Sequence, residues 1–126
     1  MREGKDITLI GYGNLMRTLM ATANRLQEEG ISAEVIDLQT IYPYDAQTLI
    51  NSVKKTGRCL ITHEAPKTVG MGGEISAKIQ EECFLNLKAP ISRVCGYDTP
   101  FPLAQELIYL PTEWKIYEAA KKCINY

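Results

Sequence analysis

The only histidine of the sequence stands where a parallel sheet could present it to a cysteine. His63 follows one short apolar run, and Cys95 ends another, with Asp98 shortly after it. If the two runs are neighbouring strands, the three side chains reach one sheet edge, and they are the residue types of a Cys-His-Asp thiol hydrolase. Cys95, however, is expected at the end of a strand. The pKa of a thiol falls at the start of a helix, and Cys95 does not have that position. A structural or interface histidine is therefore favoured over a stand-alone hydrolase that uses Cys95 and His63.

A glycine pair offers a second candidate site. Gly11 and Gly13 follow the first apolar run and open a helical pattern, while Asp37 lies near the end of the next run. This arrangement is similar to a dinucleotide-binding turn, but Met16 occupies the position where a third small residue would let helix and strand approach. A plain strand-to-helix turn capped by Asn14 is favoured, and a nucleotide-binding module at Gly11–Gly13 is the alternative.

The cysteines and the charge balance exclude several other classes of protein. The four cysteines, at 59, 83, 95 and 123, show no C-x-x-C pairing, and one histidine gives no zinc-ligand spacing, so no metal site is expected. Fourteen Lys and Arg against fifteen Asp and Glu give a net charge of -1, which offers no field for nucleic acid or anionic lipid. No apolar run approaches the roughly 20 residues of a membrane span.

Strand and helix patterns alternate along the chain. Apolar runs predict strands over residues 7–10, 32–38, 58–62 and 91–95. Helical spacing predicts helices over 14–30 and 45–57, a third that carries Ile75, Ile79 and Cys83, and a last one from about Thr112 with Trp114, Tyr117, Ala120 and Ile124 facing inward. Each return to the sheet needs a crossover helix. The predicted fold is therefore a single α/β domain over 1–126, with a mostly parallel, doubly wound sheet between two helical layers.

The segment between the fourth strand and the last helix begins with a stiff, partly apolar loop. It runs from Gly96 to Pro102 and includes Tyr97 and Phe101. Such a loop either packs over the sheet edge or contacts another protein. We assign no role to the following segment, Leu103–Leu110.

Six segments together carry a family resemblance: Glu34–Leu38, Lys55–Arg58, His63–Pro66, Gln80–Leu87, Ala89–Pro102 and Ile124–Tyr126. They resemble the beta subunits of branched-chain 2-oxo acid dehydrogenases, the decarboxylase component also called 2-oxoisovalerate dehydrogenase. The resemblance spans nearly the whole chain, and the stretch from Gln80 to Pro102 separates it from the pyruvate dehydrogenase relatives.

The resemblance implies a transketolase C-terminal-like domain of a mitochondrial matrix enzyme with two alpha and two beta subunits. Such enzymes use thiamine diphosphate with magnesium to decarboxylate the 2-oxo acids of valine, leucine and isoleucine and to acylate a lipoyl group. The cofactor lies between the alpha subunit and an earlier domain of the beta subunit, so this segment alone is expected to hold no cofactor and to be inactive. The family also has an antiparallel edge strand at whose end this sequence begins, which leaves four strands.

The resemblance also implies an assembly role. The C-terminal domain joins the two beta subunits and binds the subunit-binding domain of the acyltransferase core, by analogy near Lys88, Ser92, Arg93 and Tyr126. Relatives tend to have a carboxylate at the position of Lys88, so the charge expected to meet a basic partner is reversed here. His63 and Glu64 match the family's His-Glu-Ala-Pro segment and are expected at a junction between domains rather than in catalysis.

Overall fold

The computed structural model describes residues 2–126, and its centre is a four-stranded parallel sheet. The strands are β1 (Ile7–Gly11), β2 (Ala33–Asp37), β3 (Cys59–Pro66) and β4 (Ser92–Gly96), in the spatial order β2-β1-β3-β4. Every neighbouring pair is parallel, so each connection crosses over the sheet with a helix. The predicted α/β class and doubly wound parallel sheet are confirmed.

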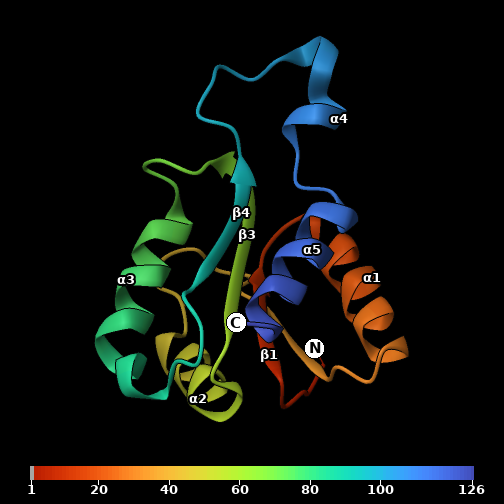
Figure 1. The fold of residues 1–126 in the computed structure, drawn as a ribbon. Helices are drawn as coiled ribbons and strands as arrows, with labels where there is room; N and C mark the ends of the chain where they lie inside the picture. The colour runs from red at the N-terminus through yellow and green to blue at the C-terminus, as the bar shows by residue number, and fades with distance from the viewer. Residues whose placement is uncertain (1) are drawn as a thin grey trace.

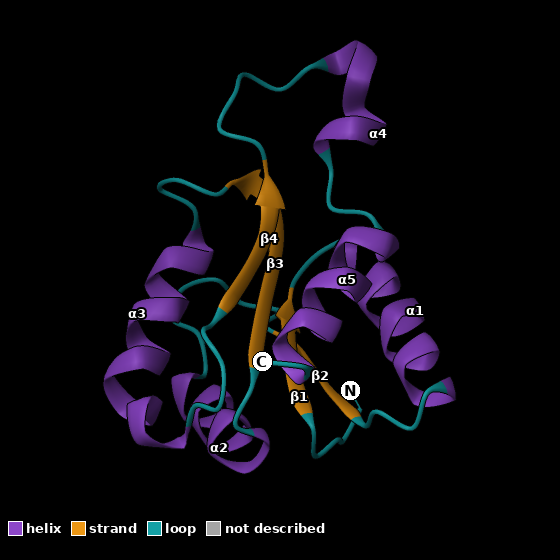
Figure 2. Ribbon diagram, in the orientation of Figure 1, coloured by secondary structure: helices purple, strands orange, loops and turns teal. Residues whose placement is uncertain are grey.

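Two helices cover each face of the sheet (Figures 1 and 2). Helices α1 (Leu15–Glu28) and α5 (Glu113–Ile124) lie on one face, and α2 (Ala46–Thr56) and α3 (Met71–Cys83) lie on the other. Three short elements complete the described chain: η1 (Phe84–Asn86), η2 (Leu103–Gln105) and α4 (Glu106–Tyr109). No helix within residues 2–126 combines the length and apolar character needed to cross a bilayer.

The sheet separates two apolar cores because successive strand residues face opposite sides. Leu9 and Leu60 pack in the core beneath α1 and α5, whereas Ile10 and Ile61 pack in the core beneath α2 and α3. All four side chains are at most 1% exposed. Strands buried on both faces explain why the sequence shows apolar runs rather than alternation.

The ends of two helices follow local signals. The Asp45 carboxylate accepts the backbone N–H of Thr48 at 3.0 Å, which confirms the predicted N-cap, and Gly57 ends the same helix with a φ of 75°. Asn14 occupies the N-cap position of α1, but its side chain makes no capping hydrogen bond. Asn14 therefore occupies the predicted N-cap position, but its side chain does not cap the helix.

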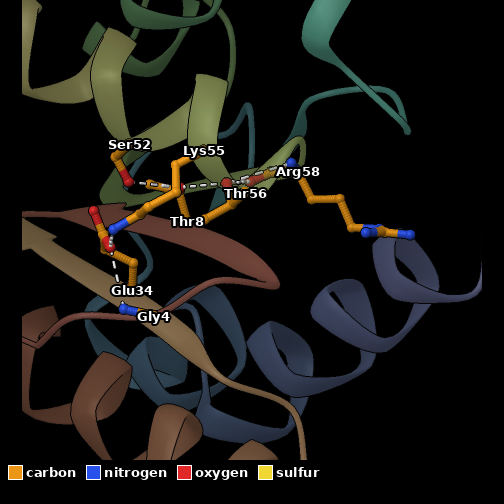
Figure 3. A network of polar contacts seen from close by, with 7 residues as sticks. All are labelled: Gly4, Thr8, Glu34, Ser52, Lys55, Thr56 and Arg58. Carbon is orange, nitrogen blue, oxygen red and sulfur yellow. Dashed lines mark hydrogen bonds and ion pairs between the residues drawn. The ribbon is translucent and has the colours of Figure 1, made fainter.

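A buried polar network joins α2 to the sheet (Figure 3). The hydroxyl oxygen of Thr8 lies 2.7 Å from that of Ser52 and 2.8 Å from that of Thr56, and all three residues are buried. Nearby, Lys55 forms an ion pair with Glu34, a residue of β2. Hydrogen bonds thus fix α2 against β1 and β2 where the packing is not apolar.

Two details differ from the prediction. Strand β3 does not end at residue 62 but continues to Pro66, with a register irregularity between His63 and Pro66. In α5 the buried side chains are Ile116, Ala120 and Cys123, while Trp114 is 52% exposed and stacks on Tyr117. Apolar residues lie on more than one stripe of this helix, so the pattern alone could not select the inward face.

Residues 97–110 form an arm that extends beyond the carboxyl end of the sheet and carries α4 (Figure 1). Tyr109 anchors the arm because its side chain is only 4% exposed, and its ring lies 5.1 Å from the ring of Phe101. The Lys115 amine donates to the carbonyl oxygen of Ile108 at 2.7 Å. The loop predicted over 96–102 is confirmed apart from Gly96, which ends β4, whereas η2 and α4 were not predicted.

The outer edge of β2 is partly occupied. Arg2 forms an isolated antiparallel bridge with Val35, in which the Val35 N–H donates to the Arg2 carbonyl oxygen at 2.9 Å. The bridge is antiparallel, as the resemblance implies for the edge strand of the family. The opposite edge of the sheet is β4.

Candidate functional site

His63 and Cys95 meet at the carboxyl end of the sheet. They are register partners in the parallel pairing of β3 and β4, and the Cys95 sulfur lies 3.4 Å from Nε2 of His63. The condition for this contact, that the two strands are neighbours, is therefore met. The carboxyl ends of parallel strands are where ligands bind in folds of this class, so the pair is the first place to look for chemistry.

The imidazole of His63 is fully enclosed. Its Nδ1 lies 3.0 Å from the carbonyl oxygen of Ala65 and donates to it, and the Tyr12 ring stacks at 6.1 Å between centroids. A Cβ at Gly70 would lie 2.6 Å from the ring, and one at Gly72 would lie 2.7 Å from Nε2. Helix α3 therefore starts against the histidine, and glycine is required there. The glycine-bearing loop could be recognised in the sequence, but its contact with the His63 ring could not.

Burial keeps both groups of the pair uncharged. Desolvation lowers the pKa of His63 and raises the pKa of the Cys95 thiol, despite the nearby Arg93 charge that favours the thiolate. With Nδ1 donating to a carbonyl, Nε2 accepts the hydrogen bond from the thiol. A nucleophilic cysteine needs the opposite arrangement, a thiolate beside an imidazolium.

Asp98 does not complete a triad. Its carboxylate accepts the backbone N–H of Thr68 at 2.8 Å and the Thr68 hydroxyl at 2.7 Å. The two imidazole nitrogens of His63 face Ala65 and Cys95 instead. The fold thus brings together His63 and Cys95, two of the three residues considered for a hydrolase, while Asp98 orients a loop. The contacts of His63 are those of a structural histidine.

The glycine turn after β1 serves packing. Gly13 has a φ of +66°, and a Cβ at Gly11 would lie 2.5 Å from the Leu19 side chain. Asp37, the acidic residue of the candidate nucleotide site, accepts the backbone N–H of Gln39 at 3.2 Å, and Met16 packs against the core. These contacts are those of the strand-to-helix turn that the sequence favoured over a nucleotide site.

The four residues expected to bind an acyltransferase lie around two adjoining cavities. One, of about 320 Å³, is lined by Ser92, Arg93 and Tyr126; the other, of about 340 Å³, is lined by Lys88 and Tyr126. Tyr126 is 76% exposed, and Ala89 and Pro90 line both cavities. Tertiary structure thus brings these positions to one surface.

The remaining interface candidates differ in exposure. Tyr97 and Phe101, at 52% and 47% exposed, lie in the arm, and Glu64 is exposed beyond the His63 position. His63 itself is 0% exposed. Within this chain Glu64 therefore offers a surface, whereas His63 can only support the turn that presents it.

The chain is similar in sequence to known proteins over its whole length. Residues 1–116 match the family described as "Transketolase, C-terminal domain". A mitochondrial 2-oxoisovalerate dehydrogenase subunit beta of Dictyostelium discoideum is 58% identical over 127 residues, which cover 100% of this chain and 34% of that protein. A 2-oxoisovalerate dehydrogenase subunit beta of Pseudomonas aeruginosa is 45% identical over 125 residues, 99% of this chain and 35% of that protein. The chain spans about a third of the length of these curated relatives.

A solved structure has the same fold. A split-gene transketolase, described as an inactive beta4 tetramer, matches with a TM-score of 0.80 and 26% identity, over 98% of this chain and 40% of that one. The resemblance read from the six sequence segments is thereby confirmed, and neither the hydrolase nor the nucleotide-binding alternative is favoured.

Proposed function

This chain belongs to the transketolase C-terminal domain family, and on that premise we propose that residues 1–126 form the C-terminal domain of the beta subunit of a branched-chain 2-oxo acid dehydrogenase. The observation that carries the proposal is 58% identity to such a subunit over the whole chain. The intact enzyme would decarboxylate the 2-oxo acids of valine, leucine and isoleucine and acylate a lipoyl group in the mitochondrial matrix. Its alpha subunits and second beta subunit would be the partners of this chain.

The cofactor of such an enzyme is expected outside this chain. Thiamine diphosphate is held through a magnesium ion, which prefers carboxylate and other oxygen ligands. Within residues 2–126 no group of three or more His, Cys, Asp or Glu side chains is placed to hold a metal ion. In line with the family resemblance, we propose that the cofactor belongs to the other parts of the enzyme and that this chain contributes assembly rather than chemistry.

The docking contact with the acyltransferase core would lie at the two cavities around Tyr126. The open apolar surface there could receive a partner side chain, and Arg93 and Lys88 would set the charge at its rim. Lys88 is exposed, and its backbone N–H donates to the carbonyl oxygen of Gly57 at 2.8 Å. A basic partner group would meet repulsion at Lys88, so we expect the apolar part of the contact to dominate.

A chimera tests the family role. The matching C-terminal segment of the Dictyostelium beta subunit would be replaced by this chain and co-expressed with the alpha subunit. We expect an assembled enzyme that decarboxylates branched-chain 2-oxo acids, while the isolated 126-residue chain turns over none of them. A chimera that folds but fails to assemble, or turnover by the isolated chain, would contradict the proposal.

Docking is tested separately with the acyltransferase's subunit-binding domain. Isothermal titration would compare the chimera with its Tyr126→Ala variant and with Lys54→Ala, which removes an exposed side chain of α2 outside both cavities. Tyr126→Ala should weaken binding by about tenfold, since truncated aromatic anchors typically cost 1 kcal/mol or more. Equal affinities of the two variants would show that the docking contact lies elsewhere, and they would leave the family assignment unchanged.

A further inference from the structure

A groove follows the free edge of β4. The strand pairs only with β3 among residues 2–126, and two cavities of about 460 and 320 Å³ lie along its other side. Both are lined by Lys67, Arg93, Ala119 and Lys122, so they form one continuous depression. Figure 1 looks onto this strand, with α3 on one side and α5 on the other. We call this depression the β4 groove.

The larger cavity lies between the outer side of β4 and α5, which contributes Lys115, Glu118, Ala119 and Lys122 to its lining. Arg93 and Cys95 point to the α3 side, where they approach Lys67 and His63, whereas Val94 packs into the core on the α5 side. Arg93, Val94 and Cys95 nevertheless all line the same cavity, as does Gly96. Because β4 ends the sheet and pairs only with β3 among residues 2–126, its outward main-chain N–H and C=O groups are free beside this cavity.

The charge of the β4 groove is positive although that of the whole chain is -1. Lys67, Arg93, Lys115 and Lys122 line it, against the carboxylates of Asp98 and Glu118. The Asp98 carboxylate is already engaged with the backbone and hydroxyl of Thr68. Lys67 and Lys122 make no side-chain hydrogen bond or ion pair within the described residues, so both ammonium groups are available to a ligand.

We propose that the β4 groove binds an extended acidic segment of a partner protein, which adds to β4 as a further strand and places its carboxylates against Lys67 and Lys122. Main-chain pairing supplies affinity in this mode of recognition, and side chains supply specificity. The proposal goes beyond the acyltransferase contact, with which it shares Ser92, Arg93 and Tyr126 as lining residues, and it does not depend on the dehydrogenase assignment.

The test uses the 126-residue chain and a fluorescein-labelled peptide in which Glu alternates with Val. Fluorescence anisotropy should show saturable binding of this peptide and none of a peptide in which Lys replaces Glu. Lys67→Glu should weaken binding by about tenfold and Lys122→Gln by about threefold. The control is Lys5→Glu, an exposed cation ahead of β1 that lines neither cavity, and it should bind like the unmodified chain.

Amide hydrogen exchange separates strand addition from loose electrostatic attraction. The acidic peptide should slow exchange at residues 92–96, where β4 would gain hydrogen bonds, and the Lys peptide should not. Equal binding of the two peptides, equal weakening by Lys5→Glu and Lys67→Glu, or binding without slower exchange in β4 would each overturn the proposal. None of these results bears on the chimera experiment, so the two proposals fail independently.

Discussion

Between pH 7 and pH 5.5 the stability of the fold should depend on pH chiefly through one residue. His63 is the only histidine of the chain, and burial lowers its pKa in the folded state. In the unfolded chain a histidine titrates near pH 6.5, so as the pH falls below that value the unfolded state binds a proton first. The free energy of unfolding should therefore be fully retained above about pH 7 and decline as the medium becomes more acidic.

The size of the effect is bounded by the unfolded-state titration. One proton gives at most about 1.4 kcal/mol per pH unit, and from an unfolded pKa of about 6.5 the loss between pH 7 and pH 5.5 is at most about 1.2 kcal/mol. Urea denaturation at several pH values measures this slope. The matched variant is His63→Asn, whose side-chain amide can still donate to the Ala65 carbonyl oxygen but does not titrate.

The two proteins are compared by how steeply their free energies of unfolding change with pH, not by their absolute stabilities, because the smaller asparagine also leaves space beside Tyr12. The unmodified chain should lose stability between pH 7 and pH 5.5, and His63→Asn should lose clearly less. The imidazole resonances of this one histidine, followed by NMR as a function of pH, give a second readout. They should report a pKa below that of a free histidine. Identical slopes, or an imidazole that titrates above pH 6.5, would refute the argument that burial holds His63 neutral.

Three further substitutions test the local packing. Gly72→Ala should destabilise the fold by about 2 kcal/mol in urea denaturation, because the added Cβ would overlap the buried His63 ring. Gly73→Ala, whose Cβ would lie 3.5 Å from an arginine nitrogen, should be neutral or stabilising by up to about 1 kcal/mol. Similar losses for the two variants would contradict the close contact at Gly72. Asp45→Ala should cost about 1 kcal/mol in thermal melts monitored by circular dichroism, but Asn14→Ala much less, since only the first side chain caps a helix. Thr8→Val should cost about 1–3 kcal/mol, because buried hydroxyls lose a partner, and an unchanged urea midpoint would show that the network adds no stability.

Much of the fold could be predicted because its signals are local. Apolar runs located all four strands, and the carboxylate of Asp45 and the glycine at 57 marked the ends of α2. The inward face of α5 was predicted wrongly for Trp114, which lies outside the buried stripe of Ile116 and Ala120. A helix with apolar residues on several sides has no single inward face until its neighbours are in place.

The candidate site was predictable only in part. The residue types of the Cys95 and His63 pair could be read from the sequence, but their contact depended on whether β3 and β4 are neighbours. The sequence could not show that Asp98 binds Thr68, nor that Gly72 lies against the imidazole. These contacts join elements far apart in the chain, and no periodicity records them.

By itself, the sequence determined the order of the four strands and of the four helices that cover them, the α/β class and the family, since apolar periodicity, caps and motif segments are properties of neighbouring residues. Tertiary structure alone decided that the lone histidine is enclosed and uncharged, and that Lys67, Arg93 and Lys122 share one groove. The physical reason is that burial and local charge density depend on the strand order β2-β1-β3-β4, which brings together side chains that local preferences cannot place.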